Sequence, residues 1–156
     1  MTTPLRYRLF LKAAQRVWRI QRGVTLGAQA MVIDQQSQVL LVRHGYQHGW
    51  RFPGGGVEKN ESAETAIGRE LLEETGVAIE GRPEFFGLFT NFRAFPSDHI
   101  ALFLVRKFRQ MPPPPLGWEI TERGFFPLDA LPDETVEAVK RRLAEVRSGG
   151  PRATDW

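Results

Sequence analysis

The chain has 156 residues, of which 42% are hydrophobic and 25% charged, and it contains no cysteine. This composition is typical of one folded domain and excludes a disordered chain, disulfide bonds, thiolate metal sites and a cysteine nucleophile. No apolar run approaches the roughly eighteen residues that a membrane span needs, so we expect a single domain in the cytoplasm.

The net charge of +3 is unevenly distributed along the chain. The residues before Asp34 carry +6 and no acidic side chain, whereas the rest of the chain carries −3. Apolar residues recur at helical spacing between residues 5 and 20, with arginines between them, which predicts a basic amphipathic helix over residues 1–22. Three roles are open for it: packing on the domain, which we favour, peripheral contact with a membrane of anionic lipid, or contact with an RNA 5′ end.

Two strands are predicted over residues 24–33 and 38–43, joined by a polar turn of hairpin length. The second contains the run VLLV, which is apolar on both faces and therefore predicts an interior strand. A polar loop at residues 44–49 and a short aromatic segment at residues 50–52 follow. Pro53 ends that segment because it cannot donate a hydrogen bond to a sheet.

A helix is predicted after the glycine run, beginning at Asn60 or Ser62, both good N-caps, and ending at Gly76, a good C-terminal stop. We then expect, in chain order, strands over residues 84–91 and 99–108, a stiff polyproline connector at 111–115, a strand within 118–126, and a final helix that stops at 149–151. Strands mixed with helices predict a layered α/β or α+β domain, with helices packed against a mixed sheet.

The central helix carries three carboxylates, Glu70, Glu73 and Glu74, on one face, because residues three and four apart are neighbours on a helix. Two alanines one and two turns earlier lie on that face, so the carboxylates continue an apolar stripe. Arg69 reaches Glu73, but one guanidinium cannot neutralise three carboxylates that repel each other. Oxygen ligands without His or Cys favour Mg²⁺ or Mn²⁺, or Ca²⁺, and the alternative is a solvated acidic surface.

The spacing around these carboxylates resembles the signature of the Nudix hydrolases. That signature is G-x5-E-x7-R-E-U-x-E-E-x-G-U, with U aliphatic, and the chain matches it at Gly55, Glu61 and the run RELLEETGV at residues 69–77. A Phe-Pro-Gly-Gly run before it and a later FFPLDALP stretch are also similar to the family. The resemblance implies an α/β/α sandwich with a central mixed sheet over residues 23–148, followed by a tail at 149–156.

In that family, the residues matching Glu70, Glu73 and Glu74 are the usual metal ligands, and a loop carbonyl matching Gly54 often joins them. The resemblance therefore implies a Mg²⁺ or Mn²⁺ site. Four other positions of the signature are expected to support this site: Gly55, Glu61, Arg69 and Gly76. Of these, Glu61 and Arg69 are expected to orient the helix and its carboxylates.

The resemblance implies a divalent-metal-dependent pyrophosphohydrolase that cleaves a nucleoside diphosphate linked to another moiety, by attack of a metal-activated water on phosphorus. A general base must accept the proton of that water. Glu73 and Glu74 are candidates, and so are Glu119 and Glu122, because related enzymes sometimes use a glutamate from a later loop. The alternatives are a pyrophosphohydrolase for RNA 5′ ends or (d)NTPs, and a nucleotide-binding regulatory module without activity.

Three further residues are candidates for contact with the substrate. Arg43 ends a predicted strand and Arg51 precedes the glycine run, where each can meet a phosphate or simply face solvent. Phe92, with Phe95 nearby, can stack on a base, although simple packing is the alternative that we favour. The expected partner is a small nucleoside diphosphate derivative, no DNA is expected, and the oligomeric state is open, with a homodimer as one option.

Overall fold

The computed structural model describes residues 23–156, so the basic helix expected over residues 1–22 lies outside the described residues. The elements follow in the order β1 (Thr25–Val32), β2 (Gln38–His44), β3 (Trp50–Arg51), β4 (Gly54–Gly56), α2 (Ala63–Thr75), β5 (Val77–Ile79), β6 (Glu84–Thr90), β7 (Asp98–Val105), β8 (Phe108–Gln110), β9 (Ile120–Pro127) and α3 (Glu137–Ser148). Neither helix in residues 23–156 combines the length and the apolar character that crossing a membrane requires.

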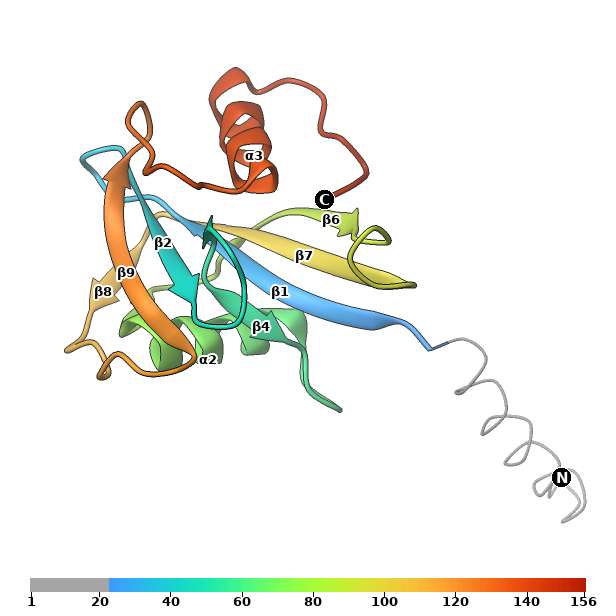
Figure 1. The fold of residues 1–156 in the computed structure, drawn as a ribbon, viewed down its shortest axis with the longest axis horizontal. Coiled ribbons are helices and arrows are strands. Elements are labelled where there is room, and N and C mark those ends of the chain that lie inside the picture. The colour runs from blue at the N-terminus through green and yellow to red at the C-terminus, as the bar shows by residue number, and fades with distance from the viewer. Residues whose placement is uncertain (1–22) are drawn as a thin grey trace, which may run out of the picture.

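The strands are arranged around a parallel pair, β1 and β7, within the order β4-β1-β7-β6. β2 lies between β3 and β9 in a second, antiparallel sheet, and β5 pairs with β8. Figure 1 shows α2 on one side of these strands and α3 on the other. The predicted α/β/α sandwich with a central mixed sheet is therefore confirmed for the described residues.

Side chains alternate across the central strands and fill a separate core on each face. On β1, Met31 belongs to the core beneath α3, whereas Ala28 and Ala30 belong to the core beneath α2. Ile67 and Leu71 of α2, both fully buried, complete that second core. Because Ala28 and Ala30 have small side chains, α2 can lie close to β1 and to β4, the strand next to it.

The structure differs from the predicted strands at two places. β1 and β2, expected as a hairpin, meet in an isolated bridge between Ile33 and Val39 and then belong to different sheets. The strand expected over residues 99–108 is two strands, because the chain turns at the exposed Arg106 and Lys107 and then pairs with β5. The VLLV run does form an interior strand, as predicted.

The segment at residues 149–156, expected as a tail, packs against the sheet. The ring of Trp156 lies 5.7 Å from that of Phe89 and 6.4 Å from that of Phe52, measured between centroids. The backbone N–H of Trp156 donates to the carbonyl of Thr90 at 2.8 Å, and Figure 1 shows this end of the chain beside β6. The segment thus covers part of the free edge of β6, which would otherwise expose unpaired backbone groups.

We expect Trp156→Ala to lower the free energy of unfolding by about 2 kcal/mol, because it removes a partly buried ring from the core beneath α3. Equilibrium unfolding in urea measures this value. Trp118→Ala is the control, since Trp118 is 79% exposed and its loss should change stability by less than about 0.5 kcal/mol. Equal stabilities of the two variants would contradict the packing role of Trp156.

Candidate active site

Helix α2 begins and ends at residues suited to those positions. The Oγ of Ser62, at the N-cap, accepts a hydrogen bond from the backbone N–H of Thr65 at 3.0 Å. Gly76 follows the last turn with a φ of 73°, and its N–H donates to the carbonyl of Leu72 at 3.1 Å. Of the two starts predicted from sequence, Ser62 is the cap and Asn60 lies in the preceding turn.

The glycines of β4 allow the carboxylates of α2 to approach the backbone. A Cβ at Gly55 would lie 2.5 Å from Oε1 of Glu70, too close for any side chain to be accommodated without movement. The N–H of Gly54, whose φ of 141° suits glycine, donates to Oε2 of Glu74 at 2.8 Å. The strand and the helix therefore meet at Glu70 and Glu74, with no side chain between them.

The guanidinium of Arg69 joins the loop before α2 to the carboxylates on the helix. Nε and Nη2 of Arg69 donate to the two carboxylate oxygens of Glu61, each at 3.0 Å, and Nη2 also reaches the carbonyl of Gly56. Nη1 donates to Glu70 at 2.7 Å and to Glu73 at 3.3 Å. The hydrogen bonds from Arg69 lower the pKa of Glu61 and raise the pKa of Arg69, so both groups are held in their charged forms.

Glu74 is the most buried of the helix carboxylates, with 6% of the residue exposed. Burial, and then repulsion from Glu70, Glu119 and Glu73, raises its pKa to about 8, against the opposing hydrogen bond from the N–H of Gly54. Arg69 contacts Glu61, Glu70 and Glu73 but makes no hydrogen bond with Glu74 among the described residues. The carboxylate face thus remains short of positive charge, as its helical spacing predicts.

These residues fit a hard divalent cation by their chemistry. Glu70, Glu73 and Glu74 offer only oxygen donors, on one helix face and beside a glycine strand that admits close approach. Within residues 23–156, no three His, Asp or Glu side chains are already arranged to hold a metal. In this arrangement Glu70 contacts Arg69, and Glu74 accepts a hydrogen bond from the N–H of Gly54. The resemblance to the family predicts that the carbonyl of Gly54 joins the metal ligands, whereas the contact in the structure is between the N–H of Gly54 and Glu74.

The polyproline segment brings a fourth carboxylate to this face. A pocket of about 210 Å³ is lined by Glu73 and Glu74 of α2 and by Glu119 from the segment that follows the prolines. Arg123 of β9 holds the two parts together, because it donates to the carbonyl of Glu74 at 2.9 Å and also to that of Pro114. Of the two later glutamates considered as a general base, Glu119 therefore lies at the pocket.

Glu122 and the predicted substrate-binding residues lie at different places around the site. Arg43 is paired with Glu122 at 3.3 Å and with Glu134, so its charge is already matched by two carboxylates. Arg51 is half-buried, and burial lowers its pKa. Phe92 is in the loop between β6 and β7, where its ring packs edge-on against His99. Arg51 lies near His44, on whose pKa its charge acts, whereas Arg43 and Phe92 have other partners.

Two residues of the site are not identified by sequence reasoning. His44, at the end of β2, is 8% exposed and places Nε2 3.9 Å from Oε1 of Glu74, while its Nδ1 has no hydrogen-bond partner in the described part of the chain. Burial, together with the charge of Arg51, lowers the pKa of His44. Arg123 is the second. Neither residue can be identified from its spacing in the sequence. His44 lies on β2 and Arg123 on β9, and the pairing of these strands joins distant segments of the chain.

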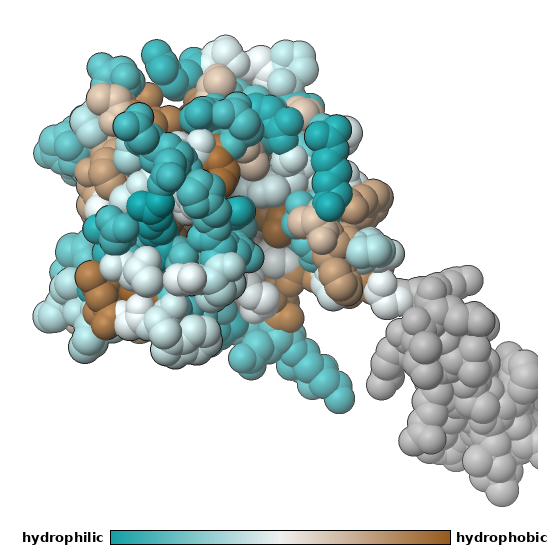
Figure 2. All heavy atoms as spheres, in the orientation of Figure 1, coloured by the Kyte–Doolittle hydropathy of each residue, from teal (hydrophilic) through white to brown (hydrophobic). Residues whose placement is uncertain are grey.

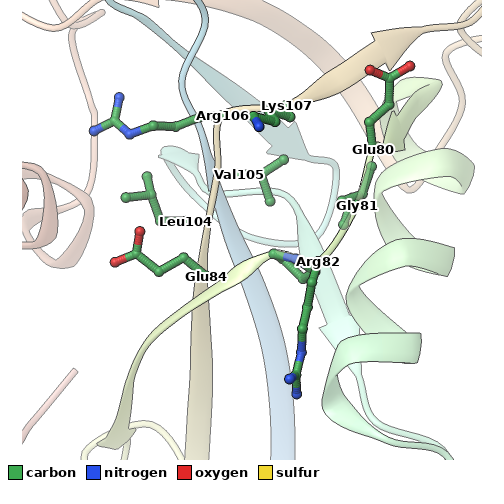
Figure 3. Close-up of a pocket in the computed structure, with 10 residues that line it drawn as sticks. Glu80, Gly81, Arg82, Glu84, Leu104, Val105, Arg106 and Lys107 are labelled. Carbon is green, nitrogen blue, oxygen red and sulfur yellow. The ribbon is translucent and has the colours of Figure 1, made fainter.

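Another pocket, of about 280 Å³, lies between the turn that follows β5 and the end of β7. Figure 3 shows that the carboxylate of Glu80 and the guanidinium of Arg106 point in different directions, and Arg82 is paired with Glu64 of α2. The charged groups do not converge, so this pocket is a poor candidate for a binding site. On the face seen in Figure 2, hydrophobic residues reach the surface in separate areas between hydrophilic ones.

The comparison with known proteins agrees with the fold and the carboxylate helix. The NUDIX domain matches residues 24–146, which is most of the chain. The chain therefore belongs to the Nudix family, as the signature predicts.

An RNA pyrophosphohydrolase of Shewanella sp. (strain ANA-3) is 39% identical over 85 residues, which are 54% of this chain and 47% of that protein. The RNA pyrophosphohydrolase of Shewanella piezotolerans is 36% identical over a segment of the same length. The chain thus aligns with about half the length of these curated relatives.

Among solved structures, the MutT NUDIX hydrolase from Burkholderia pseudomallei has a TM-score of 0.67 and 25% identity, over 78% of this chain and 97% of that one. An ADP-ribose pyrophosphatase from Streptococcus suis has a TM-score of 0.63 over 85% of this chain and 95% of that one; at 23% identity it shows the fold alone.

We expect Mg²⁺ or Mn²⁺ to raise the melting temperature of the protein, since a metal that binds only the folded state stabilises it by mass action. At a metal concentration a hundred times the dissociation constant, the gain is about 2.7 kcal/mol, or roughly 5–10 °C. Differential scanning fluorimetry with and without metal measures the shift. Glu70→Gln and Glu74→Gln should reduce it strongly.

Glu64→Gln is the matched control for this measurement. Glu64 lies on the same helix but pairs with Arg82 on another face, so its variant should keep the full metal-induced shift. A shift that persists in Glu70→Gln and Glu74→Gln would place the metal elsewhere.

Proposed function

We propose that the protein is a divalent-metal-dependent pyrophosphohydrolase that cleaves the diphosphate of a nucleoside diphosphate linked to another moiety. The observation that supports this most directly is the shared pocket of Glu73, Glu74 and Glu119, next to the contact between Glu70 and the glycine strand. Membership of the Nudix family supports the reaction class.

The role that we propose for each carboxylate follows from the groups that fix its position. Glu70 and Glu74 lie against β4, where Arg69 and the N–H of Gly54 fix their positions, and with Glu73 they would hold the metal. A divalent cation there offsets the charge of the diphosphate and lowers the pKa of a water nucleophile. Glu73 has a 61% exposed side chain and lines the pocket, so it is accessible to a substrate there.

Glu119 is our candidate for the general base that accepts a proton from the water. Its residue is exposed and lines the pocket with Glu73 and Glu74, while its own carbonyl is tied to the N–H of Gly45 at 3.0 Å. Its side chain can therefore move while its backbone stays fixed. Glu122 is less suitable because it pairs with Arg43.

Arg51 is our candidate for contact with a phosphate of the substrate. Its Nε is buried and has no hydrogen-bond partner among residues 23–156, and Nη2 contacts only a backbone oxygen, that of His48, at 3.3 Å. A half-buried guanidinium whose donors are not matched by a carboxylate is well suited to bind an anionic group. Its charge also acts on His44, which lies beside Glu74.

A second candidate function is the removal of pyrophosphate from RNA 5′ ends. The observation that favours it is the similarity to the RNA pyrophosphohydrolases of Shewanella, which extends over half of the chain. This function uses the same carboxylates and the same type of reaction. The two proposals therefore differ in the part of the substrate that is attached to the cleaved phosphates.

A substrate panel tests the proposal: ADP-ribose, UDP-glucose, dGTP, a dinucleoside polyphosphate and triphosphorylated RNA, each with Mg²⁺ or Mn²⁺. We expect ADP-ribose or UDP-glucose to yield two phosphorylated products. Glu73→Gln and Glu74→Gln should lower kcat/KM by roughly 10²-fold or more, because each removes a carboxylate that the reaction needs. Glu119→Gln should lower kcat to a similar degree with little change in KM.

Glu64→Gln is again the control and should stay within about twofold of the wild type, since its surroundings are remote from the pocket. Preference for triphosphorylated RNA would favour the second candidate function. Tight nucleotide binding without turnover of any substrate would instead indicate a regulatory module. Full activity in both Glu73→Gln and Glu74→Gln would show that the site is elsewhere.

A further inference from the structure

Two aromatic side chains, Tyr46 and Trp118, lie together at the surface although they come from distant parts of the chain. Their ring centroids are 6.3 Å apart with the planes inclined at 44°, and Tyr46 also packs on His44 at 5.2 Å. Trp118 is 79% exposed and Tyr46 is 58% exposed. Large rings normally bury most of their surface, and Trp118 is the most exposed of the large hydrophobic residues within residues 23–156.

The pair lies beside the carboxylates of the proposed active site. Trp118 lines the same 210 Å³ pocket as Glu73, Glu74 and Glu119. Burial and the negative charges of Glu119 and Glu74 raise the pKa of the Tyr46 phenol, which places Tyr46 within electrostatic reach of the same groups. A molecule that extends from the carboxylates along this pocket would meet the ring of Trp118, beside which Tyr46 lies.

Hydrogen bonds hold together the two backbone segments that carry the rings. The N–H of Gly45 donates to the carbonyl of Glu119 at 3.0 Å, and the hydroxyl of Thr121 donates to the carbonyl of Arg43 at 3.1 Å. A Cβ at Gly45 would collide with the carbonyl of Trp118, so the two segments can approach this closely because residue 45 is glycine. The two segments are thus held side by side without a ligand, which reduces the entropy lost when a ligand binds between them and the carboxylates.

We propose that Tyr46 and Trp118 form the surface on which the base of the nucleotide substrate stacks, while its diphosphate lies at Glu70, Glu73 and Glu74. This inference rests on the proposed function and adds to it the two residues that would contact the base of the substrate. Every base has a π-face, so stacking of this kind accepts different bases.

Binding of two non-hydrolysable probes tests this surface without requiring turnover. The probes are α,β-methylene-ADP, which carries adenosine, and methylenediphosphonate, which is the same diphosphate analogue without the adenosine. Isothermal titration calorimetry in the presence of Mg²⁺ measures both dissociation constants. Trp118→Ala and Tyr46→Ala should each raise the dissociation constant of α,β-methylene-ADP about tenfold and leave that of methylenediphosphonate unchanged.

Three further variants sharpen the test. Trp118→Phe keeps an aromatic ring and should retain binding of α,β-methylene-ADP within about threefold. Gly45→Ala should weaken it, because the added Cβ forces the two segments apart. Phe85→Ala is the matched control, since Phe85 is 56% exposed on β6 and packs against Phe103, so both probes should bind as they do to the wild type.

The outcomes separate this proposal from the proposed function. Unchanged binding of α,β-methylene-ADP to Trp118→Ala and Tyr46→Ala overturns the stacking surface, and so does an equal loss for both probes, which would mean that the rings only shape the pocket. If the wild type hydrolyses no diphosphate but binds α,β-methylene-ADP through these rings, the stacking surface stands and the hydrolase proposal fails. The tenfold, base-dependent loss supports the surface.

Discussion

The position of the carboxylates depends on one side chain, the guanidinium of Arg69. It is bound by both oxygens of Glu61 and by the carbonyl of Gly56, so it ties the loop before α2 to the end of β4. The same group contacts Glu70 and Glu73, and it therefore sets the distance between helix and strand at which these carboxylates lie. A lysine could offer the charge but not the fork of donors that makes these contacts at once.

The second half of the site is attached to the C-terminal end of α2. The N–H of Met111 donates to the carbonyl of Gly76 at 2.8 Å, and Arg123 contacts the carbonyls of Glu74 and Pro114. The prolines between these anchors restrict the backbone, so the segment has few ways to reach β9. Glu119 arrives at the carboxylate pocket because the connector is stiff and anchored at both ends.

Local signals made part of this structure predictable. The N-cap and the C-terminal stop of α2 were identifiable because Ser62 and Gly76 act on the backbone within a few residues, and helical spacing alone groups Glu70, Glu73 and Glu74. The pairing of β2 with β9, which brings His44 beside Glu74, has no such signal. Nor does the packing of residues 149–156, since the partners of Trp156 lie in segments far from it in the chain.

The residues proposed for the reaction and those proposed for substrate selectivity lie in different parts of the fold. The carboxylates proposed to hold the metal lie on α2, which forms a nearly continuous stretch with β4 and the loop between them, whereas Glu119, the candidate general base, lies in the loop before β9. The groups proposed to contact the rest of the substrate are Arg51 on β3, Tyr46 in the loop after β2 and Trp118 in the loop before β9, and the bond between Gly45 and Glu119 joins these two loops. Changes in those loops can alter the ligand that is accepted without moving the carboxylates, because the contacts of Arg69 stay within the first stretch. A signature confined to that stretch therefore defines the reaction class and carries no information on the base.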